Sequence, residues 1–428
     1  MAGAGHGLRG LSLTSQPLVG MQPPMVTPRM AEFSLPGLRL ELPLERISPD
    51  RERDEQALAA LLDRQQAELG AQAPLGWRRL PAKSLEDAGI AAQAARLAEG
   101  ANELLLIGMG GSINGARCVY RALELDSRLL RAVEFMDNPD PASVVSLLEG
   151  IDPEHCSVLA VSRSGTTLET VSMLAAALQF LEAGNANAPG VAVCCLENDN
   201  PLARLADERN WQRIPFTADT GGRFSMFSAS GLLPLAFAGL DIQALCRAGA
   251  ETAEQLESTR CSDNPAWLLS GMLLGDGCAN CVLYVYADLL LGFGDWWRQL
   301  IAESTGRTLA DGSRVGINPV LARGASDQHS LNQLFMDGPL NCSYVFLSCR
   351  ESPFDIGIKR GTELLPEGQR HMAGRSLGEL LEASRRGTLA TLRDRGMPTA
   401  ELVLERLDET ALGSLLQLWM HTTACLGI

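Results

Sequence analysis

The sequence contains very little lysine, few aromatic residues and no long apolar run. Among its 428 residues only Lys83 and Lys359 are lysines, so arginine supplies nearly all of the positive charge. Aromatic residues make up 5% of the chain, and no segment approaches the ~20 continuous apolar residues of a membrane-spanning helix. A net charge of −15 also argues against nucleic acid or an anionic membrane surface. We therefore expect no membrane and no nucleic-acid partner.

The cysteines form neither a metal-binding nor a disulfide pattern. They number 11, are scattered along the chain, and Cys278 and Cys281 have no second pair at zinc-site spacing. Such usage is typical of small buried residues in a reducing cytosol. Residues 1–30 also lack the apolar core of a signal peptide. These features predict a cytoplasmic protein without a metal site.

What the chain does contain is an alternation of apolar runs and amphipathic stretches. Its 46% hydrophobic content and 42 glycines are typical of an α/β enzyme, and its length suggests two domains. Alternating strands and helices predict doubly wound, mostly parallel sheets, although no residue-level repeat relates the two halves. The predicted strands are 103–108, 133–137, 156–161, 191–196, 281–286 and 343–348. The predicted helices are 54–69, 116–125, 142–148, 167–182, 232–240, 266–274, 288–302 and 328–336.

A loop rich in hydroxyl groups, residues 162–167, follows one of these predicted strands. The start of the next helix offers unpaired backbone N–H groups and the positive end of the helix dipole, which favour an anion. Four hydroxyls beside Arg163 suit a phosphate better than a carboxylate. The alternative is a Ser/Thr-rich helix cap without a ligand. The hydroxyl residues are Ser162, Ser164, Thr166 and Thr167.

Two further loops contain glycines where a strand meets a helix. In the first, Gly108 to Ser112, the glycines allow a ligand to approach the backbone. Its spacing departs from the G-x-G-x-x-G of dinucleotide-binding folds, although Asp137 could take the acidic role. In the second, Arg223 follows two glycines, where its guanidinium can hold oxyanions. The alternative for Arg223 is an ordinary surface position.

Glu303 lies near the end of a predicted helix that Gly306 closes. Trp296, Leu300 and Glu303 fall at i, i+4 and i+7, which places the carboxylate on the apolar face. A carboxylate in such surroundings should have a raised pKa and suit proton abstraction. The alternative is a surface ion pair between Glu303 and Arg307 at i, i+4.

His329 is the histidine with the most suggestive position. We expect it in the first turn of a helix capped by Ser326 or Asp327, where the positive helix end keeps the imidazole neutral. The rival histidines are His371 and His421. Most lone histidines are structural, so position alone leaves this choice open.

Taken together and in this order, these segments resemble the glucose-6-phosphate isomerase family. The matching segments are LLLIGMGGSINGA, AVSRSGTTLET, TGGRFSMFSASGLLPLA, WWRQLIAESTGR and SDQHSLNQLFMDGP. The resemblance covers about residues 75–340, with looser similarity beyond. Five ordered motifs are far more specific than any one of them, and dinucleotide binding would explain only the first.

The resemblance implies an α/β protein with two flavodoxin-like, three-layer αβα sandwich domains of the sugar-isomerase (SIS) type, usually in a homodimer. We expect an N-terminal extension with a helix (1–74), a first SIS domain with the phosphate loop (75–240), and a second with the catalytic glutamate (241–428). It implies conversion of glucose 6-phosphate to fructose 6-phosphate in glycolysis and gluconeogenesis, without metal or redox cofactor. A dual-specificity enzyme that also acts on mannose 6-phosphate is a variant of this function.

The resemblance also implies roles for individual residues. Arg223 would stabilise the enediolate, and Glu303 would move the proton between C2 and C1. His329 would assist ring opening, although longer family members use a histidine nearer His371. Gly111 and Ser112 would line the sugar. The phosphate would be bound by Ser162, Arg163, Ser164, Thr166 and Thr167, with Arg163 where the family often has lysine.

The resemblance breaks at the C-terminus. Family members continue past a segment like 425–428 into a loop resembling N-P-F-D-Q-P and a helix with a catalytic lysine, which this sequence lacks. A truncated sequence is the explanation we favour. The others are ring opening by histidine and water, or a non-catalytic phosphosugar-binding protein such as a sensor.

Overall fold

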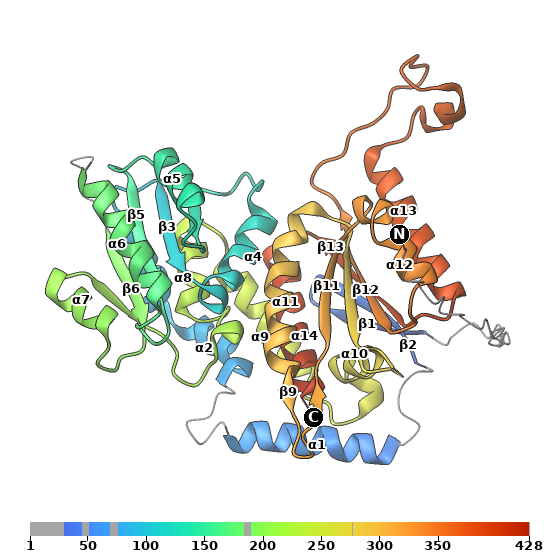
Figure 1. Ribbon diagram of the computed structural model, residues 1–428, viewed down its shortest axis with the longest axis horizontal. Helices are drawn as coiled ribbons and strands as arrows, with labels where there is room; N and C mark the ends of the chain where they lie inside the picture. The colour runs from blue at the N-terminus through green and yellow to red at the C-terminus, as the bar shows by residue number, and fades with distance from the viewer. Residues whose placement is uncertain (1–29, 45–50, 69–75, 184–189, 276, 428) are drawn as a thin grey trace, which may run out of the picture.

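Two α/β units lie side by side in the computed structural model (Figure 1). The structure describes residues 30–44, 51–68, 76–183, 190–275 and 277–427; for α1 (Arg51–Glu68) it describes side chains only over 55–63. The predictions that concern residues 1–29 therefore lie outside the described residues. In the described part of the chain, no helix is long and apolar enough to cross a membrane.

The first unit is a five-stranded, wholly parallel sheet in the order β4-β3-β5-β6-β7. This is the flavodoxin-like order 2-1-3-4-5, in which the chain leaves β3 in one direction for β4 and later returns on its other side as β5. The strands are β3 (Glu103–Gly108), β4 (Ala132–Met136), β5 (Cys156–Val161), β6 (Val191–Cys195) and β7 (Gln212–Pro215).

Helices cover both faces of this sheet. Leu104 and Leu106 point to one side, into a core with α3, α4 and α8, whereas Leu105 and Ile107 point to the other, into a core with α5, α6 and α7. The helices of this unit are α2 (Leu80–Glu86), α3 (Ala88–Leu97), α4 (Asn114–Leu123), α5 (Pro141–Gly150), α6 (Leu168–Ala183), α7 (Pro201–Arg209) and α8 (Ala229–Ala238). The predicted three-layer sandwich is confirmed here.

The second unit is a six-stranded sheet in the order β1-β2-β13-β12-β8-β11. The four strands β11-β8-β12-β13 are parallel, and numbered by their order in the chain they follow the order 2-1-3-4, as the first four strands of the first sheet do. The hairpin β1–β2 pairs with β13 in antiparallel fashion through β2. Residues 30–43 of the predicted N-terminal extension thus form part of the second sheet. The strands are β1 (Met30–Leu35), β2 (Leu38–Pro43), β8 (Asn280–Val285), β11 (Asn318–Arg323), β12 (Cys342–Glu351) and β13 (Thr399–Arg406).

The second sheet also has helices on both faces. Val282 and Tyr284 pack with α12 and α13, and Leu283 and Val285 pack on the opposite side with α10, α11 and α14. The helices are α9 (Ile242–Gln255), α10 (Pro265–Leu273), α11 (Leu291–Thr305), α12 (Asn332–Asp337), α13 (Leu377–Asp394) and α14 (Glu409–Leu426); β9 (Arg307–Thr308) and β10 (Arg314–Val315) form a small ribbon.

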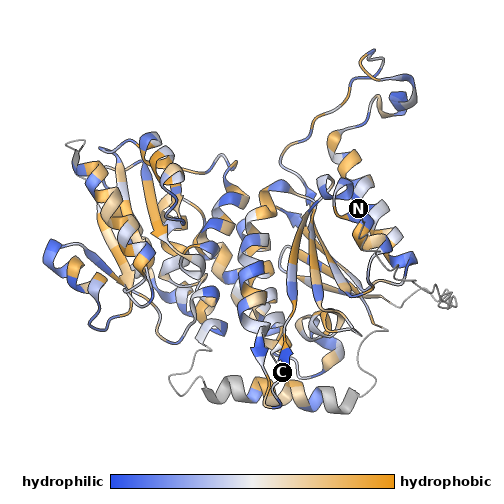
Figure 2. Cartoon of the chain, viewed as in Figure 1, coloured by the Kyte–Doolittle hydropathy of each residue, from blue (hydrophilic) through white to orange (hydrophobic). Residues whose placement is uncertain are grey.

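One continuous apolar core joins the two units. The inner faces of both sheets contribute to it, and the helices α4, α9, α11 and α14 lie between them (Figure 1). Trp296, Trp297 and Trp419 are almost fully buried in this layer. Figure 2 shows the same arrangement as apolar strands inside helices whose outer faces are polar. The relative position of the two units is therefore fixed by side-chain packing.

All strands predicted from the sequence are present, with bounds shifted by at most one residue except for β12, which continues to Glu351. The predicted helices are present too, except that 328–336 is divided into a 3₁₀ turn, η6 (Ser326–His329), and the short α12. The sequence did not predict β7, β11, β13, α2, α3, α7, α9, α13, α14, the ribbon β9–β10 or the hairpin β1–β2.

The hairpin gives a direct test of this fold. Leu40 of β2 is fully buried, so Leu40→Ala should lower the free energy of unfolding by about 2–5 kcal/mol. Glu32→Ala is the matched control, because Glu32 is exposed on β1 and its ion pair with Arg39 (3.4 Å) contributes at most about 1 kcal/mol. Denaturant unfolding measures both. Equal effects of the two substitutions would contradict the placement of β2 in the core.

Candidate functional site

The hydroxyl-rich loop lies at the carboxyl end of β5, immediately before α6. Gly165 has φ +66°, a conformation that L side chains rarely adopt. A Cβ built on Gly165 would also lie 1.8 Å from Oδ1 of Asn200, the residue that caps α7. Glycine at this position therefore lets the loop turn tightly against the neighbouring helix.

The hydroxyl groups of this loop are paired with one another. Ser162 Oγ and Thr167 Oγ1 are 2.9 Å apart, and Ser164 Oγ and Thr166 Oγ1 are 2.8 Å apart. Ser162 is buried beneath the loop, whereas Ser164 and Thr166 are exposed at its tip. The exposed Arg163 donates from Nη2 to the carbonyl oxygen of Ala218 (3.0 Å). The structure thus brings together all five residues of the predicted phosphate loop.

The glycine loop follows the neighbouring strand. Gly108 ends β3 directly opposite Val161 of β5, so the two loops leave adjacent parallel strands at the same edge of the sheet. This is the point where the chain direction along the sheet reverses, which is where ligands bind in open α/β sheets. The short turn η2 (Gly110–Ser112) then leads into α4. Gly111 and Ser112 are both partly exposed.

The loop that contains Gly221, Gly222 and Arg223 packs directly on the glycine loop 108–112. A Cβ on Gly111 would lie 2.5 Å from both the carbonyl carbon of Gly222 and the backbone nitrogen of Arg223. Both contacts are to backbone atoms, which cannot move aside as a flexible side chain could. Glycine at position 111 is thus required for η2 to meet η3 (Gly222–Phe224).

Arg223 reaches from η3 to the end of α11. Its Nη1 lies 3.3 Å from Glu303 Oε2, and its Nε donates to Ser304 Oγ (2.7 Å). Its carbonyl oxygen accepts from Trp296 Nε1 (3.2 Å). The guanidinium is also 5.3 Å from the Phe224 ring centroid. The structure therefore brings together the predicted oxyanion-binding arginine and the predicted base.

The surroundings of Glu303 differ from those the sequence predicts. Trp296 and Leu300 are buried, but the Glu303 side chain is 52% exposed. The core covers α11 to its last residue, where Thr305 is buried, and Glu303 lies at the edge of this covered face. Its placement on an apolar face is therefore wrong. The alternative ion pair with Arg307 is also absent: Glu303 contacts Arg223, and Arg307 donates to the carbonyl oxygen of Gly427 (2.7 Å).

Sequence reasoning missed Gln299, one turn before Glu303 on α11. Gln299 Nε2 donates to Glu303 Oε1 (3.0 Å), and Gln299 Oε1 accepts from Asn114 Nδ2 (2.8 Å). The i, i+4 spacing from Glu303 was the available signal, because a residue four positions before a helical carboxylate lies beside it.

The predicted helix start at His329 is wrong. Residues 326–329 form a 3₁₀ turn and α12 begins at Asn332, because the Asp327 side chain is engaged with the backbone N–H of Arg323 (2.6 Å) instead of capping a helix. His329 is exposed just beyond the carboxyl end of β11. Glu303 lies at the other end of that strand, since Thr305 accepts from the backbone of Ile317 (3.1 Å). The strand alone separates these ends by roughly 17 Å.

Neither rival histidine contacts Glu303, which is hydrogen-bonded to Arg223 and Gln299. His371 is exposed on η7 (Glu367–Met372), within the segment between β12 and α13 that extends from the body of the molecule (Figure 1). His421 is buried in α14, its ring centroid 4.9 Å from that of Trp77. Burial lowers the pKa of His421 well below its usual value, and the nearby charge of Arg78 acts in the same direction. His421 is thus a neutral core residue.

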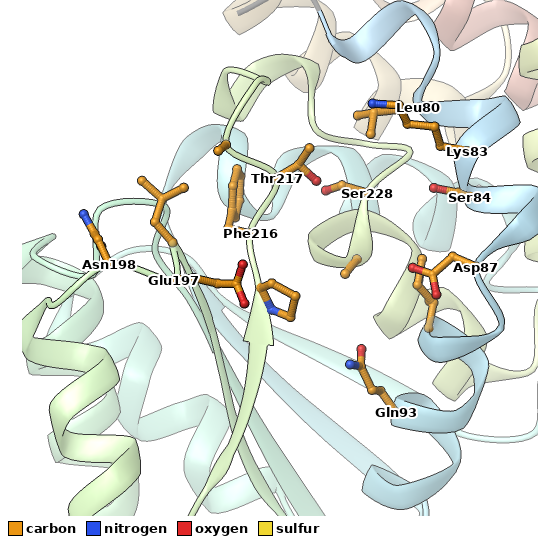
Figure 3. A pocket seen from close by; sticks show the side chains of 15 residues that line it. Leu80, Lys83, Ser84, Asp87, Gln93, Glu197, Asn198, Phe216, Thr217 and Ser228 are labelled. Carbon is orange, nitrogen blue, oxygen red and sulfur yellow. The ribbon is translucent and has the colours of Figure 1, made fainter. Parts of the chain in front are cut away.

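A pocket of about 600 Å³ is lined in part by Ala218, whose carbonyl oxygen Arg163 contacts; Figure 3 shows the lining. Thr217 and Ala218 form one wall, and Lys83, Ser84 and Asp87 from α2 and its end form another. Lys83 pairs with Asp219 at 3.5 Å. The lining contains none of the predicted catalytic residues. Among the described residues, no group of three His, Cys, Asp or Glu side chains is arranged to hold a metal ion.

Comparison with known proteins relates most of the chain to one family. The family model described as phosphoglucose isomerase matches residues 92–428. A glucose-6-phosphate isomerase from Rubrobacter xylanophilus is 34% identical over 375 residues, which cover 83% of this chain and 84% of that protein. A solved structure, a hypothetical protein from Thermus thermophilus, matches with a TM-score of 0.80 at 30% identity and covers 90% of this chain and 92% of that one.

A second solved structure supports the fold alone. The glucose-6-phosphate isomerase from Chlamydia trachomatis matches with a TM-score of 0.74 at 20% identity, over 93% of this chain and 86% of that one. With the strand orders of both sheets, this confirms the predicted flavodoxin-like α/β fold.

The loop at Gly165 gives a test of the anion site. Gly165→Ala should weaken the binding of inorganic phosphate by at least about tenfold, because alanine is strained at this φ and its Cβ would displace Asn200. Isothermal titration calorimetry measures the change. Gly150→Ala is the control, since a Cβ there meets nothing within 4 Å. Equal phosphate affinities in the two variants would place the anion elsewhere.

Proposed function

Because the chain belongs to the phosphoglucose isomerase family, we propose that it interconverts D-glucose 6-phosphate and D-fructose 6-phosphate, a step of glycolysis and gluconeogenesis. The observation that carries this proposal is the family match over residues 92–428, which contains both ligand loops, Arg223 and Glu303. The alternative, a non-catalytic phosphosugar-binding protein, is not favoured by relatives named as isomerases. We further propose that 75–240 and 241–428 are its two SIS domains and that it acts in the cytoplasm.

We propose that the loop 162–167 binds the substrate phosphate. The exposed hydroxyls of Ser164 and Thr166 and the backbone N–H groups at the start of α6 support this role, as does the positive end of that helix. Arg163 would supply a full positive charge by leaving Ala218 for the phosphate. The remaining hydroxyls, Ser162 and Thr167, would complete the set, and Gly111 and Ser112 would line the sugar.

Glu303 is the proposed base. It would remove the proton from C2 of the open-chain aldose, which gives an enediolate with its negative charge on O1. The hydroxyl proton then moves from O2 to O1, and Glu303 returns its proton to C1, which leaves the ketose with its carbonyl at C2. The exposed Glu303 side chain is accessible to a ligand. The carboxylate contacts Arg223 of η3, and η3 packs against Gly111 of η2, so Glu303 lies beside the two glycine turns. Arg223 would stabilise the negative charge that develops on the enediolate oxygen.

Ring opening is assigned to a histidine, with His329 as the first candidate and His371 as the alternative. Neither lies near Glu303 within one chain, because His329 is at the opposite end of β11 and His371 is on the extended segment. We therefore propose a homodimer in which a second copy brings this histidine to the site. The exposure of both histidines is consistent with such an arrangement.

The role of Glu303 is tested by Glu303→Gln. Because the amide cannot accept a proton, turnover of glucose 6-phosphate should fall by about 10²–10⁴-fold while the substrate still binds with similar affinity. Coupled detection of fructose 6-phosphate measures turnover, and calorimetry measures binding. Glu254→Gln, at an exposed position on α9, is the control for the same change. Unchanged turnover in Glu303→Gln would mean that another group is the base.

The phosphate loop is tested by Thr167→Ala. Loss of a hydroxyl that binds a dianionic phosphate should raise the Kd for glucose 6-phosphate by about tenfold. Thr391→Ala is the control, because Thr391 is exposed on α13 and its hydroxyl donates within its own helix, to the carbonyl oxygen of Gly387. An affinity equal to that of the control would remove Thr167 from the phosphate site.

A further inference from the structure

A line of polar side chains connects α4 of the first unit to the proposed base on α11. Arg117 Nη2 donates to Asn114 Oδ1 (3.1 Å), and Asn114 Nδ2 donates to Gln299 Oε1 (2.8 Å). Gln299 Nε2 then donates to Glu303 Oε1 (3.0 Å). The line ends on one carboxylate oxygen, while Arg223 Nη1 approaches the other at 3.3 Å.

Only one orientation of the two amide groups satisfies this line. A guanidinium has donors and no acceptor, so the Asn114 atom that faces Arg117 must be the oxygen. The Asn114 NH₂ therefore faces Gln299, and because it can only donate, the Gln299 atom it meets must be Oε1. The Gln299 NH₂ is left for Glu303, whose ionised carboxylate can only accept. The numbers of donors and acceptors thus determine which atom of each amide is the oxygen and which is the nitrogen, from Arg117 to Glu303.

The starting point of the line is held in place by charge. Arg117 forms an ion pair with Asp137, and its Nη2 lies 3.9 Å from Asp295. Its side chain is only 22% exposed. Since Arg117 is anchored from two sides, its donor toward Asn114 is fixed in direction.

The glycine loop supplies the space for this arrangement. A Cβ on Gly110 would lie 2.9 Å from Gln299 Nε2, and the residue has φ +52°. The Gln299 amide is therefore packed against the backbone of η2, close to the predicted sugar-binding residues Gly111 and Ser112.

We propose that Asn114 is a positioning residue for the isomerisation: it orients Gln299 so that its NH₂, and not its carbonyl oxygen, faces Glu303. This inference rests on the proposed role of Glu303 as the base. The terminal amide of glutamine rotates readily, so without Asn114 either end could meet the carboxylate. A carbonyl oxygen there would repel the ionised form that abstracts the proton. Among the described residues, Arg223 is the charged group hydrogen-bonded to Glu303.

The diagnostic variant is Asn114→Asp, which keeps the shape of the side chain but removes its donor. Because the new carboxylate can only accept, it should turn the Gln299 NH₂ toward itself and the Gln299 oxygen toward Glu303. Glu303 should then titrate at a pH higher by about one unit, with a matching shift in the acid limb of the kcat/KM profile. We expect kcat to fall about tenfold with little change in KM.

The negative charge that Asn114→Asp adds could by itself raise the pH at which Glu303 titrates, so the substitution is compared in proteins with and without the Gln299 amide. In Gln299→Leu there is no amide to rotate, and Asn114→Asp should then produce a clearly smaller shift than in the wild-type background. Asn102→Asp, at an exposed position immediately before β3, controls for the change in net charge.

The titration can be read without turnover, by carboxyl ¹³C NMR of glutamate-labelled protein with Glu303 assigned through Glu303→Gln. A shift that depends on Gln299 supports the proposal. No shift, or equal shifts with and without Gln299, would overturn it. If the Gln299-dependent shift is found but the wild-type protein does not isomerise glucose 6-phosphate, the positioning role stands and the proposed function fails. If the wild-type protein isomerises glucose 6-phosphate but no Gln299-dependent shift is found, the proposed function stands and the positioning role of Asn114 fails.

Discussion

The site depends on the backbone contact between two glycine turns. Gly111 meets Gly222 and Arg223 so closely that no side chain fits between them, and this contact sets how far Arg223 lies from the carboxyl edge of the first sheet. The indole of Trp296 fixes the same turn from the other side by donating to the Arg223 carbonyl oxygen. The arginine proposed to stabilise the enediolate is thus held by backbone geometry and by a helix of the second unit. Its main chain is fixed, while its guanidinium lies at the partly exposed junction where the substrate would bind.

The shared core explains why two units can build one site. Glu303, Gln299 and Trp296 are on α11, whose connections place it between β8 and β11 of the second sheet. The helix nevertheless packs against α4 of the first unit and α14 of the second. The ring centroids of Trp297 and Trp419 lie 5.6 Å apart within this layer. Trp296 donates to the backbone of η3, so α11 lies against the loops that follow the first sheet. The exposed carboxylate therefore depends on a buried helix for its position.

Much of this arrangement could be predicted from sequence because it is encoded locally. Buried parallel strands are continuous apolar runs, so β3 and β5 were recognisable, and the loops after them follow from the positions of glycine and hydroxyl residues. The edge hairpin β1–β2 was not recognised, since its place beside β13 depends on a pairing more than 350 residues away in sequence. The residues of the predicted phosphate loop, together with Arg223 and Glu303, could be selected from the sequence. The contacts among them could be found only in the tertiary structure.

Two of the errors concern the surroundings of a side chain. Periodicity placed Glu303 with Trp296 and Leu300, but it does not show where the edge of the buried face lies around a helix, and Glu303 is at that edge. Similarly, Asp327 looked like a helix cap, yet its carboxylate engages the strand that precedes it, and α12 begins later. Gln299 was missed because an amide neither takes up nor releases a proton, so its chemistry does not mark it as a catalytic candidate. The surroundings of Glu303 and Asp327 depend on neighbours outside their own elements, whereas the contact between Gln299 and Glu303 lies within α11.

The central claim is proton transfer by Glu303 within a phosphosugar bound at this junction. The most direct measurement is the isomerisation of fructose 6-phosphate in D₂O by the wild-type chain, followed by NMR. The account predicts glucose 6-phosphate with deuterium at C2, because a carboxyl group that takes a proton from carbon exchanges it with solvent before returning it. Binding of fructose 6-phosphate without isomerisation, or isomerisation without any solvent deuterium on carbon, would contradict it.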